Sequence, residues 1–213
     1  MSAPGTVSIT GGTVQFGNAS TAGSPNFRIG AASGATNVLP SLTINATGTP
    51  TVTLNTAATI RGNVTLGTGT TFVANNMAIA VTGNTLPGTA TGNWTNNGGT
   101  FTAGTRVVTF NGTTQAIAGS SATTFATLTI ANGSTTTGTT APTVTNFNLN
   151  AGSKYIHPTA TAIVPGTTKT FDATSTYEWQ GTGNFPSALG TSFGNLIINS
   201  ASGNNNAGGN LTT

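Results

Sequence analysis

A short segment with the alternation of a β-strand recurs three times along this chain, and this recurrence limits the possible folds more than any other feature of the sequence. The copies are Ser41–Asn45, Thr127–Ala131 and Asn195–Asn199. Each copy places apolar side chains at every second position, which is the period of a half-buried strand. Self-similarity over long intervals is typical of folds that stack one structural unit many times.

A second strand-like segment precedes each copy by about 20 to 28 residues, an interval typical of one or a few strand-and-turn units. It has the order apolar, polar, aromatic, turn residue, and it occurs at Val14–Gly17, Val108–Asn111 and Tyr177–Gln180. When the three segments are aligned, they predict one aromatic ladder inside the fold. The predicted core ladder contains Val14, Phe16, Val108, Phe110, Tyr177 and Trp179, with Gln15, Thr109 and Glu178 on the opposite, solvent-facing side.

A third element follows the recurring strand. Asn63–Leu66, followed by Phe72, reappears as Asn146–Leu149, followed by Tyr155, and begins again at Gly209–Thr212. Measured on the recurring strand, the super-repeat is about 86 residues long in its first copy and about 68 in its second. We therefore expect residues 1–213 to form a single solenoid segment, with imperfect super-repeats at about residues 5–91, 92–170 and 171–213, the last of them truncated.

The composition argues against helices and against disorder. Only 3% of the residues are charged, and the chain contains 30 Gly and 9 Pro, so it lacks both the polar face of amphipathic helices and good helix formers. Thr, Val, Ile and Phe favour strands instead. A chain rich in Gly, Ser and Asn can also be disordered. The 35% of hydrophobic residues and alternations such as Thr51–Leu54 favour an ordered all-β fold.

Among all-β folds, the repetition favours a right-handed parallel β-solenoid, or β-helix, over a sandwich or barrel of the same length. At about 20 to 25 residues per coil, the chain has room for roughly eight or nine coils of two or three short strands each. The right hand follows from the general preference of parallel crossover connections. Turns such as Asn111-Gly112 and Asn132-Gly133 accept positive φ at low cost. Stacked Asn side chains can also hydrogen-bond along the solenoid axis.

Two stretches resemble the repeats of very long secreted surface proteins of Bacteroidota. The first runs from Gly92 to Ile130 through the Asn96–Gly99 turn, and the second is Phe171–Gly181. The resemblance covers residues 92 to 213 well and residues 5 to 91 more loosely. It implies an extracellular, solenoid-like, adhesin-type stalk of the kind often exported by a C-terminal sorting domain. Because neither that domain nor an N-terminal export signal is in the sequence, we expect the chain to be a piece of a longer protein.

Few residues could carry catalysis. The two acidic residues, Asp172 and Glu178, are about 20 Å apart if the intervening chain is extended, which is too far for a working carboxylate pair. We interpret Asp172 as a turn residue and Glu178 as a solvent-facing one. His157, the single histidine, has no second ligand or acidic partner near it in the sequence and is interpreted as a surface loop residue. The sequence therefore predicts no enzyme, no metal site and no cofactor.

The remaining bulk features narrow the possible partners. The chain has no cysteine, so it has neither disulfides nor thiol chemistry. No apolar run reaches the roughly 18 residues that a membrane helix needs. Although the sequence pI is near 10.0, the basic residues form no cluster, which argues against nucleic-acid binding. These scattered residues are Arg28, Arg61, Arg106, Lys154 and Lys169.

Two binding functions remain as alternatives. The first is carbohydrate binding, for which Trp94 is the candidate stacking platform, since the alignment places Tyr177, Trp179 and Tyr155 inside. The second is ice binding by outward threonines, which needs Thr-x-Thr pairs in register on one flat face. The pairs begin at Thr51, Thr68, Thr100, Thr127, Thr143 and Thr174, at intervals between about 16 and 32 residues. Pairs in register would favour ice binding, and scattered pairs would favour a stalk.

The sequence as a whole predicts a structural or adhesive segment of an extracellular surface protein or filament, secreted and displayed on the cell. Its expected partners are further copies of itself, joined end to end, and cell-surface or matrix polysaccharide. End-to-end joining is expected because strand edges with little charge template pairing with another chain.

Overall fold

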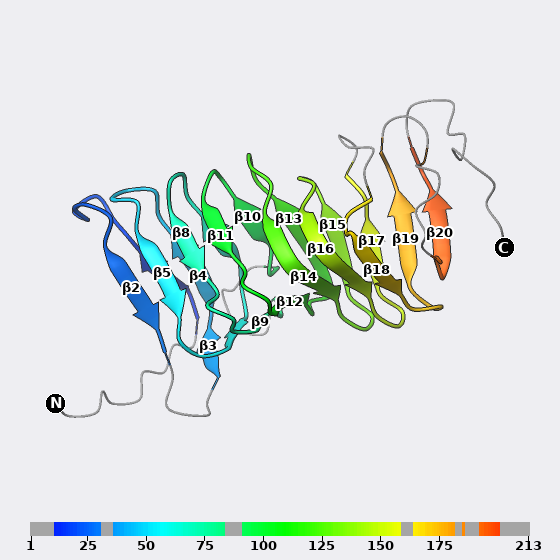
Figure 1. Cartoon of the computed structure of the whole chain (residues 1–213), viewed down its shortest axis with the longest axis horizontal. Helices are drawn as coiled ribbons and strands as arrows, with labels where there is room; N and C mark the ends of the chain where they lie inside the picture. The colour runs from blue at the N-terminus through cyan, green and yellow to red at the C-terminus, as the bar shows by residue number, and fades with distance from the viewer. Residues whose placement is uncertain are drawn as a thin grey trace.

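The fold is a parallel β-solenoid. The computed structural model describes residues 11–30, 36–83, 91–158, 164–181, 185 and 192–200. Throughout these residues the chain is all-β, and its strands stack side by side along one long axis (Figure 1). Every strand pair is parallel. The fold class predicted from the sequence is thus confirmed.

The strands form three sheets, each of which is one face of the solenoid. Sheet A contains, in spatial order, β1 (Thr13–Phe16), β4 (Ser41–Ile44), β7 (Val64–Leu66), β10 (Trp94–Asn96), β13 (Thr114–Ala118), β15 (Thr135–Gly138), β17 (Lys154–Ile156), β19 (Thr176–Trp179) and β20 (Asn195–Ile198). Sheet B contains β2 (Asn26–Ile29), β5 (Thr51–Leu54), β8 (Thr71–Val73) and β11 (Thr100–Thr102). Sheet C contains β3 (Asn37–Leu39), β6 (Ala58–Ile60), β9 (Ile79–Val81), β12 (Val107–Phe110), β14 (Thr124–Ile130), β16 (Thr143–Leu149) and β18 (Thr168–Phe171).

The cross-section of the solenoid changes along its axis. Coils up to β12 carry one strand in each sheet, whereas from β13 onward a coil contributes one strand to sheet A and one to sheet C. The strands β14 and β16 have 7 residues each and are the longest of the described strands. Phe125, near the start of β14, packs on Phe101 of β11 with ring centroids 5.8 Å apart. The first half of β14 therefore lies beside the last strand of sheet B, while its second half belongs to sheet C.

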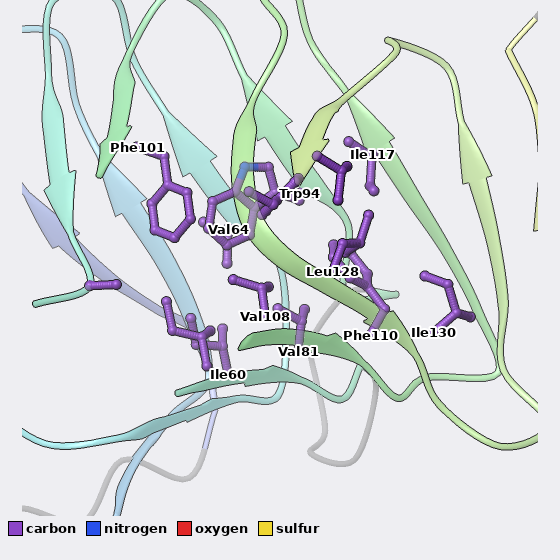
Figure 2. Close-up of a cluster of buried hydrophobic side chains, with 14 of the residues drawn as sticks. Ile60, Val64, Val81, Trp94, Phe101, Val108, Phe110, Ile117, Leu128 and Ile130 are labelled. Carbon is purple, nitrogen blue, oxygen red and sulfur yellow. The ribbon is translucent and has the colours of Figure 1, made fainter. Parts of the chain in front are cut away.

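The core runs along the inside of the solenoid and is built from one repeated pattern. In the central strands, alternate residues are buried: Val52 and Leu54 of β5 point inward, and Thr51 and Thr53 point outward. Figure 2 shows the indole of Trp94 among inward side chains from several coils, with the Phe101 ring 4.8 Å away between centroids. Each aliphatic or aromatic side chain buried in this way contributes about 1.5 to 3 kcal/mol, so the stack is held together mainly by apolar burial.

The recurring sequence segments are strands stacked directly on one another. Val14 of β1 is in register with Leu42 of β4, Val108 of β12 with Leu128 of β14, and Tyr177 of β19 with Leu196 of β20. The third element continues the first two stacks, since β7 pairs with β4 and β16 pairs with β14. Its third copy, at residues 209–212, lies outside the described residues.

The prediction of one aromatic ladder through Phe16, Phe110 and Trp179 is wrong. Phe16 and Trp179 lie in sheet A with six strands between β1 and β19, and Phe110 lies in sheet C. The physical reason is that every face has the same inward alternation, so similar strands occupy different faces. Val108, Phe110, Tyr177 and Trp179 are buried core residues. Val14 and Phe16, at the edge of sheet A, are half-buried and pack against the core.

Asn and Gly residues form many of the corners, as the sequence predicts. The side-chain oxygen of Asn63 accepts hydrogen bonds from the backbone N–H groups of Gly92 and Asn93 in the next coil, at 3.2 and 2.9 Å. The side chain of Asn93 in turn accepts from the N–H of Ala116, one coil further, at 2.8 Å. These asparagines satisfy backbone donors where the sheet ladder is interrupted.

Gly83 and Gly92 lie against each other in the solenoid, and this close contact is called the neck below. Gly83 and Gly92 have φ of +67° and +84°, and a Cβ on Gly92 would lie 2.6 Å from the Cα of Gly83. The buried Gln115 side chain fixes both sides of this neck from the next coil. It donates to the carbonyl of Val81, before the neck, at 3.0 Å, and to the carbonyl of Gly92, after it, at 2.8 Å. Residues 84–90 connect the two glycines in sequence.

Candidate functional site

Trp94, the sequence candidate for a sugar-stacking platform, is a core residue. Its side chain is fully buried, in register with Val64 and Ile117 of the neighbouring coils. Its Nε1–H donates to Oγ1 of Thr123 at 3.1 Å. The prediction that Trp94 contacts sugar is therefore wrong. The reason is that Trp94 occupies an inward position of the alternation, and Thr123 supplies the one hydrogen bond that its indole needs.

His157 is also buried, contrary to its interpretation as a surface loop residue. Its ring stacks on the Trp179 indole with centroids 4.2 Å apart and an interplanar angle of 21°. Its Nδ1 lies 2.7 Å from the hydroxyl of Tyr177. Tyr155, two residues earlier, is inward as well, so the period of two that begins at Tyr155 is the sequence signal that would have placed His157 inside.

Glu178 lies on the outer side of β19 but is not exposed to solvent as predicted, because only 6% of its surface is accessible. The Nζ of Lys154, from the preceding coil, lies 2.5 Å from its Oε2. Gln180 and Asn199 donate to its Oε1 at 2.6 and 3.0 Å. These three donors, with Lys154 the strongest, lower the pKa of Glu178 to about 2. The arrangement joins successive coils through the Glu178 carboxylate.

Acid should weaken the C-terminal coils through Glu178. Because its pKa in the folded chain lies below its ordinary value of 4.5, its ionised form stabilises the fold above about pH 4.5, and this stabilisation is lost as the pH falls toward 2. We expect Glu178→Gln to lower stability at neutral pH by about 1 kcal/mol, a modest loss because Lys154 is partly exposed. Urea melts of both proteins between pH 7 and pH 2.5 measure this difference.

Asp172 also contributes to acid sensitivity, since the Thr174 side chain and backbone lower its pKa. The test is therefore the difference between the wild type and Glu178→Gln, which should shrink below pH 4.5. A difference that stays constant down to pH 2.5 would contradict the role given to the Glu178 ion pair.

Asp172 and Lys169 each make local contacts within their own coil. Asp172 is a turn residue, as the sequence indicates: its Oδ1 accepts hydrogen bonds from the N–H and the hydroxyl of Thr174 at 2.8 and 2.7 Å. Lys169 points inward and donates to the carbonyl of Gly166 at 2.5 Å, and burial lowers its pKa. In the part of the chain that the structure describes, no three His, Cys, Asp or Glu side chains come together. Nor does this part contain a helix that could cross a membrane.

Outward threonines do align across coils, but other residues interrupt them. On sheet C, four successive strands each carry two outward residues, and these pairs of residues are in register. On sheet B, four strands carry outward pairs that are also in register. The sheet C pairs are Val107/Thr109, Thr127/Thr129, Asn146/Asn148 and Thr168/Thr170. The sheet B pairs are Asn26/Arg28, Thr51/Thr53, Thr71/Val73 and Thr100/Thr102. Asn146 and Asn148 donate to the hydroxyls of Thr127 and Thr129 at 3.3 and 3.2 Å.

One surface hollow was missed by the sequence reasoning. It has a volume of about 540 Å³ and lies where three successive strands of sheet C turn toward sheet A. This corner hollow is lined by Asn132, Asn148, Leu149, Asn150, Ala151, Thr170, Phe171 and Asp172. Its sequence signal is a four-residue turn that recurs after β14, β16 and β18 and ends each time in a buried serine: Ser134, Ser153 and Ser175.

Comparison with known proteins gives no match: no protein-family model, no curated protein and no solved structure is similar to this chain.

Proposed function

We propose that this chain is a structural segment of an extracellular surface protein or filament, in which the solenoid serves as a stalk and joins further copies end to end. The observation that carries this proposal is the continuity of the parallel pairing along the axis. In the described residues, nine strands follow one another in sheet A, and each strand is hydrogen-bonded to its neighbour in the coil above or below. A rod of this kind transmits load along its length, because many hydrogen bonds act together.

Side chains reinforce the same axis. The amides of Asn146 and Asn148 bond to Thr127 and Thr129 of the preceding coil, and Lys154 bonds to Glu178 of the following one. These contacts join neighbouring coils on the outer surface. They use polar side chains that a ligand-binding surface would leave free to bond. The secreted location rests on the resemblance to surface repeats and on the low charge of the chain.

Ice binding is the less favoured function. Its requirement of aligned pairs is met in part, because the pairs of sheets B and C are in register. However, Asn, Val and Arg interrupt the threonines, and two of the sheet C hydroxyls are engaged by asparagine amides. A surface that matches an ordered lattice needs the same group, free to bond, at each position.

The outer strands support association between the ends of the solenoid. Within the described residues, β20 is the last strand of sheet A and pairs on one side only. At the other end of the solenoid, β3 is the first strand of sheet C and also pairs on one side only. The large hydrophobic side chains exposed in this part of the chain are Val38 of β3 and Ile197 of β20, at 45% and 42%. Both therefore lie on terminal strands, where apolar contact and strand pairing can combine in a second copy.

We expect the isolated chain to form head-to-tail oligomers or short fibres, because a heterologous junction does not close when the axis is straight. Sedimentation velocity and negative-stain electron microscopy over a range of concentrations measure this. Ile197→Lys should shift the distribution toward monomer, since a charge at a strand edge opposes pairing. Thr65→Lys, an outward change in the middle of sheet A, is the matched control and should leave association unchanged. A monomer at every concentration would refute the filament.

A further inference from the structure

We propose that the corner hollow binds a neutral oligosaccharide whose chain lies along the solenoid axis. This inference goes beyond the stalk function and does not depend on it, since a stalk without a ligand and a binding module that is no stalk are both possible.

The hollow exists because the chain stacks small residues at successive corners. The N–H of Asn150 donates to the carbonyl of Ile130 at 3.1 Å, and the N–H of Asp172 donates to that of Leu149 at 2.8 Å. These bonds place Ala131, Asn150 and Asp172 above one another. Ala131 leaves room beside Asn150, and the next turn residue, Ala151, lines the hollow. Large side chains at these positions would fill the space.

The polar groups that face this space have spare hydrogen-bonding capacity. The side-chain amides of Asn132 and Asn150 have no hydrogen-bond partner among the described residues, and both residues are exposed. Asn148 uses its Nδ2 on Thr129, which leaves its Oδ1. Asp172 uses its Oδ1 on Thr174, which leaves its Oδ2. Each asparagine amide can both donate and accept, which suits sugar hydroxyls, since these also do both.

The apolar part of the lining fits the same class of ligand. Phe171 is half-buried and supplies the accessible apolar surface, because Leu149 is only 1% exposed. One face of the Phe171 ring is engaged by Tyr177, with centroids 5.8 Å apart and an angle of 20°. An amphipathic ligand with C–H and O–H groups on one unit can contact the accessible part of this ring and still bond to the polar side chains of the hollow.

Charge and size exclude other occupants. Asp172 is the single charged residue of the lining, and no basic residue lies there. Its carboxylate opposes phosphates, nucleic acids and uronic acids, so an anionic sugar does not fit. Parallel strands repeat every ~4.8 Å, so the three corners span on the order of 10 Å, which is enough for about two sugar units.

The test is a titration of isotopically labelled full chain with neutral tetrasaccharides of glucose, mannose, galactose and N-acetylglucosamine, each to about 10 mM. Side-chain amide signals in NMR spectra report on Asn132, Asn148 and Asn150 directly. We expect at least one tetrasaccharide to shift these signals with millimolar or tighter affinity. No shift with any of the four sugars overturns the proposal.

Variants then locate the site. Asn150→Ala should weaken binding at least about threefold, because one hydrogen-bonding side chain is lost. Ala151→Tyr, which fills the exposed corner without removing a polar group, should abolish binding while the thermal melt stays near that of the wild type.

Asn97→Ala is the matched control, because Asn97 is an exposed turn asparagine after a strand of sheet A and lies outside the hollow. Equal weakening by Asn97→Ala, or unchanged binding by Ala151→Tyr, would overturn the proposal. So would shifts at the three asparagines with CaCl₂ alone but with none of the sugars, which would identify a cation site.

Discussion

Phe110→Asp is expected to abolish the cooperative unfolding transition of the chain. The Phe110 side chain is completely buried, in register with Val81 and Ile130, and its ring contacts Phe125 with centroids 6.5 Å apart. Replacing it removes about 3 to 5 kcal/mol of packing and buries a carboxylate with no partner. That total is comparable to the whole stability of a typical domain. Thermal melts followed by circular dichroism measure the loss.

Thr109→Asp is the matched control, because it introduces the same side chain one residue away on the outer face. Thr109 is half-buried and its register neighbours are Ala80 and Thr129, neither of which is charged. We expect its melting curve to lie close to that of the wild type. If the two variants melt alike, or if Thr109→Asp is the worse, the inward and outward assignment of β12 is wrong. Should Phe110→Asp be insoluble, the graded series Phe110→Leu and Phe110→Ala gives the same comparison.

Gly119→Ala should be the most damaging single-methyl change. Gly119 has φ of +121°, a region that residues with a side chain rarely adopt, and a Cβ there would overlap the backbone carbonyl of Asn96 in the preceding coil. Asn96 cannot give way easily, because its amide donates to the carbonyl of Ala122 at 3.1 Å and accepts from the N–H of Gly99 at 2.8 Å. We expect a loss on the order of 3 to 4 kcal/mol in a urea melt.

Gly133→Ala separates backbone strain from the steric overlap. Gly133 also has a positive φ, +69°, but nothing lies within 4 Å of a Cβ built on it. It should cost about 1 kcal/mol, which is the penalty of the left-handed conformation alone. Similar losses for the two variants would mean that the close approach between Gly119 and Asn96 does not control the spacing of the coils.

Much of the fold was predictable from the sequence because each strand encodes its own inside and outside. The alternation at Thr51–Leu54 predicts inward Val52 and Leu54, and the structure buries both. The recurring segments also predicted a fold of stacked units, although the pairing of Tyr177 with Leu196, which belong to two different recurring segments, was not among the predicted contacts. Which face a strand occupies was not predictable. Val14–Phe16 and Val108–Phe110 have the same pattern but lie in sheets A and C. The reason is that a strand on any face of the solenoid needs the same alternation of inward apolar and outward polar residues.

The burial of polar and amphipathic side chains could not be predicted from local sequence patterns, because it depends on contacts between different coils. Glu178 is covered by Lys154, and the pairing that brings them close is that of β17 with β19. Burial of Trp94 and His157 likewise required the partners Thr123 and Tyr177 from the following coils. The corner hollow arises from three turns together. A recurring turn in the sequence shows that the corners exist, but not that their small residues line up.

The neck formed by Gly83 and Gly92 has a consequence for how such a chain can evolve. Gln115 already holds its two sides together. The strand register of the neighbouring coils therefore does not depend on the sequence of residues 84–90. Doubling the number of residues between two fixed points of a chain costs only about 0.6 kcal/mol. Sequence can therefore be gained or exchanged at this point without disturbing strand register. For the same reason, the neck is the natural place at which to graft a foreign peptide for display on a rigid rod.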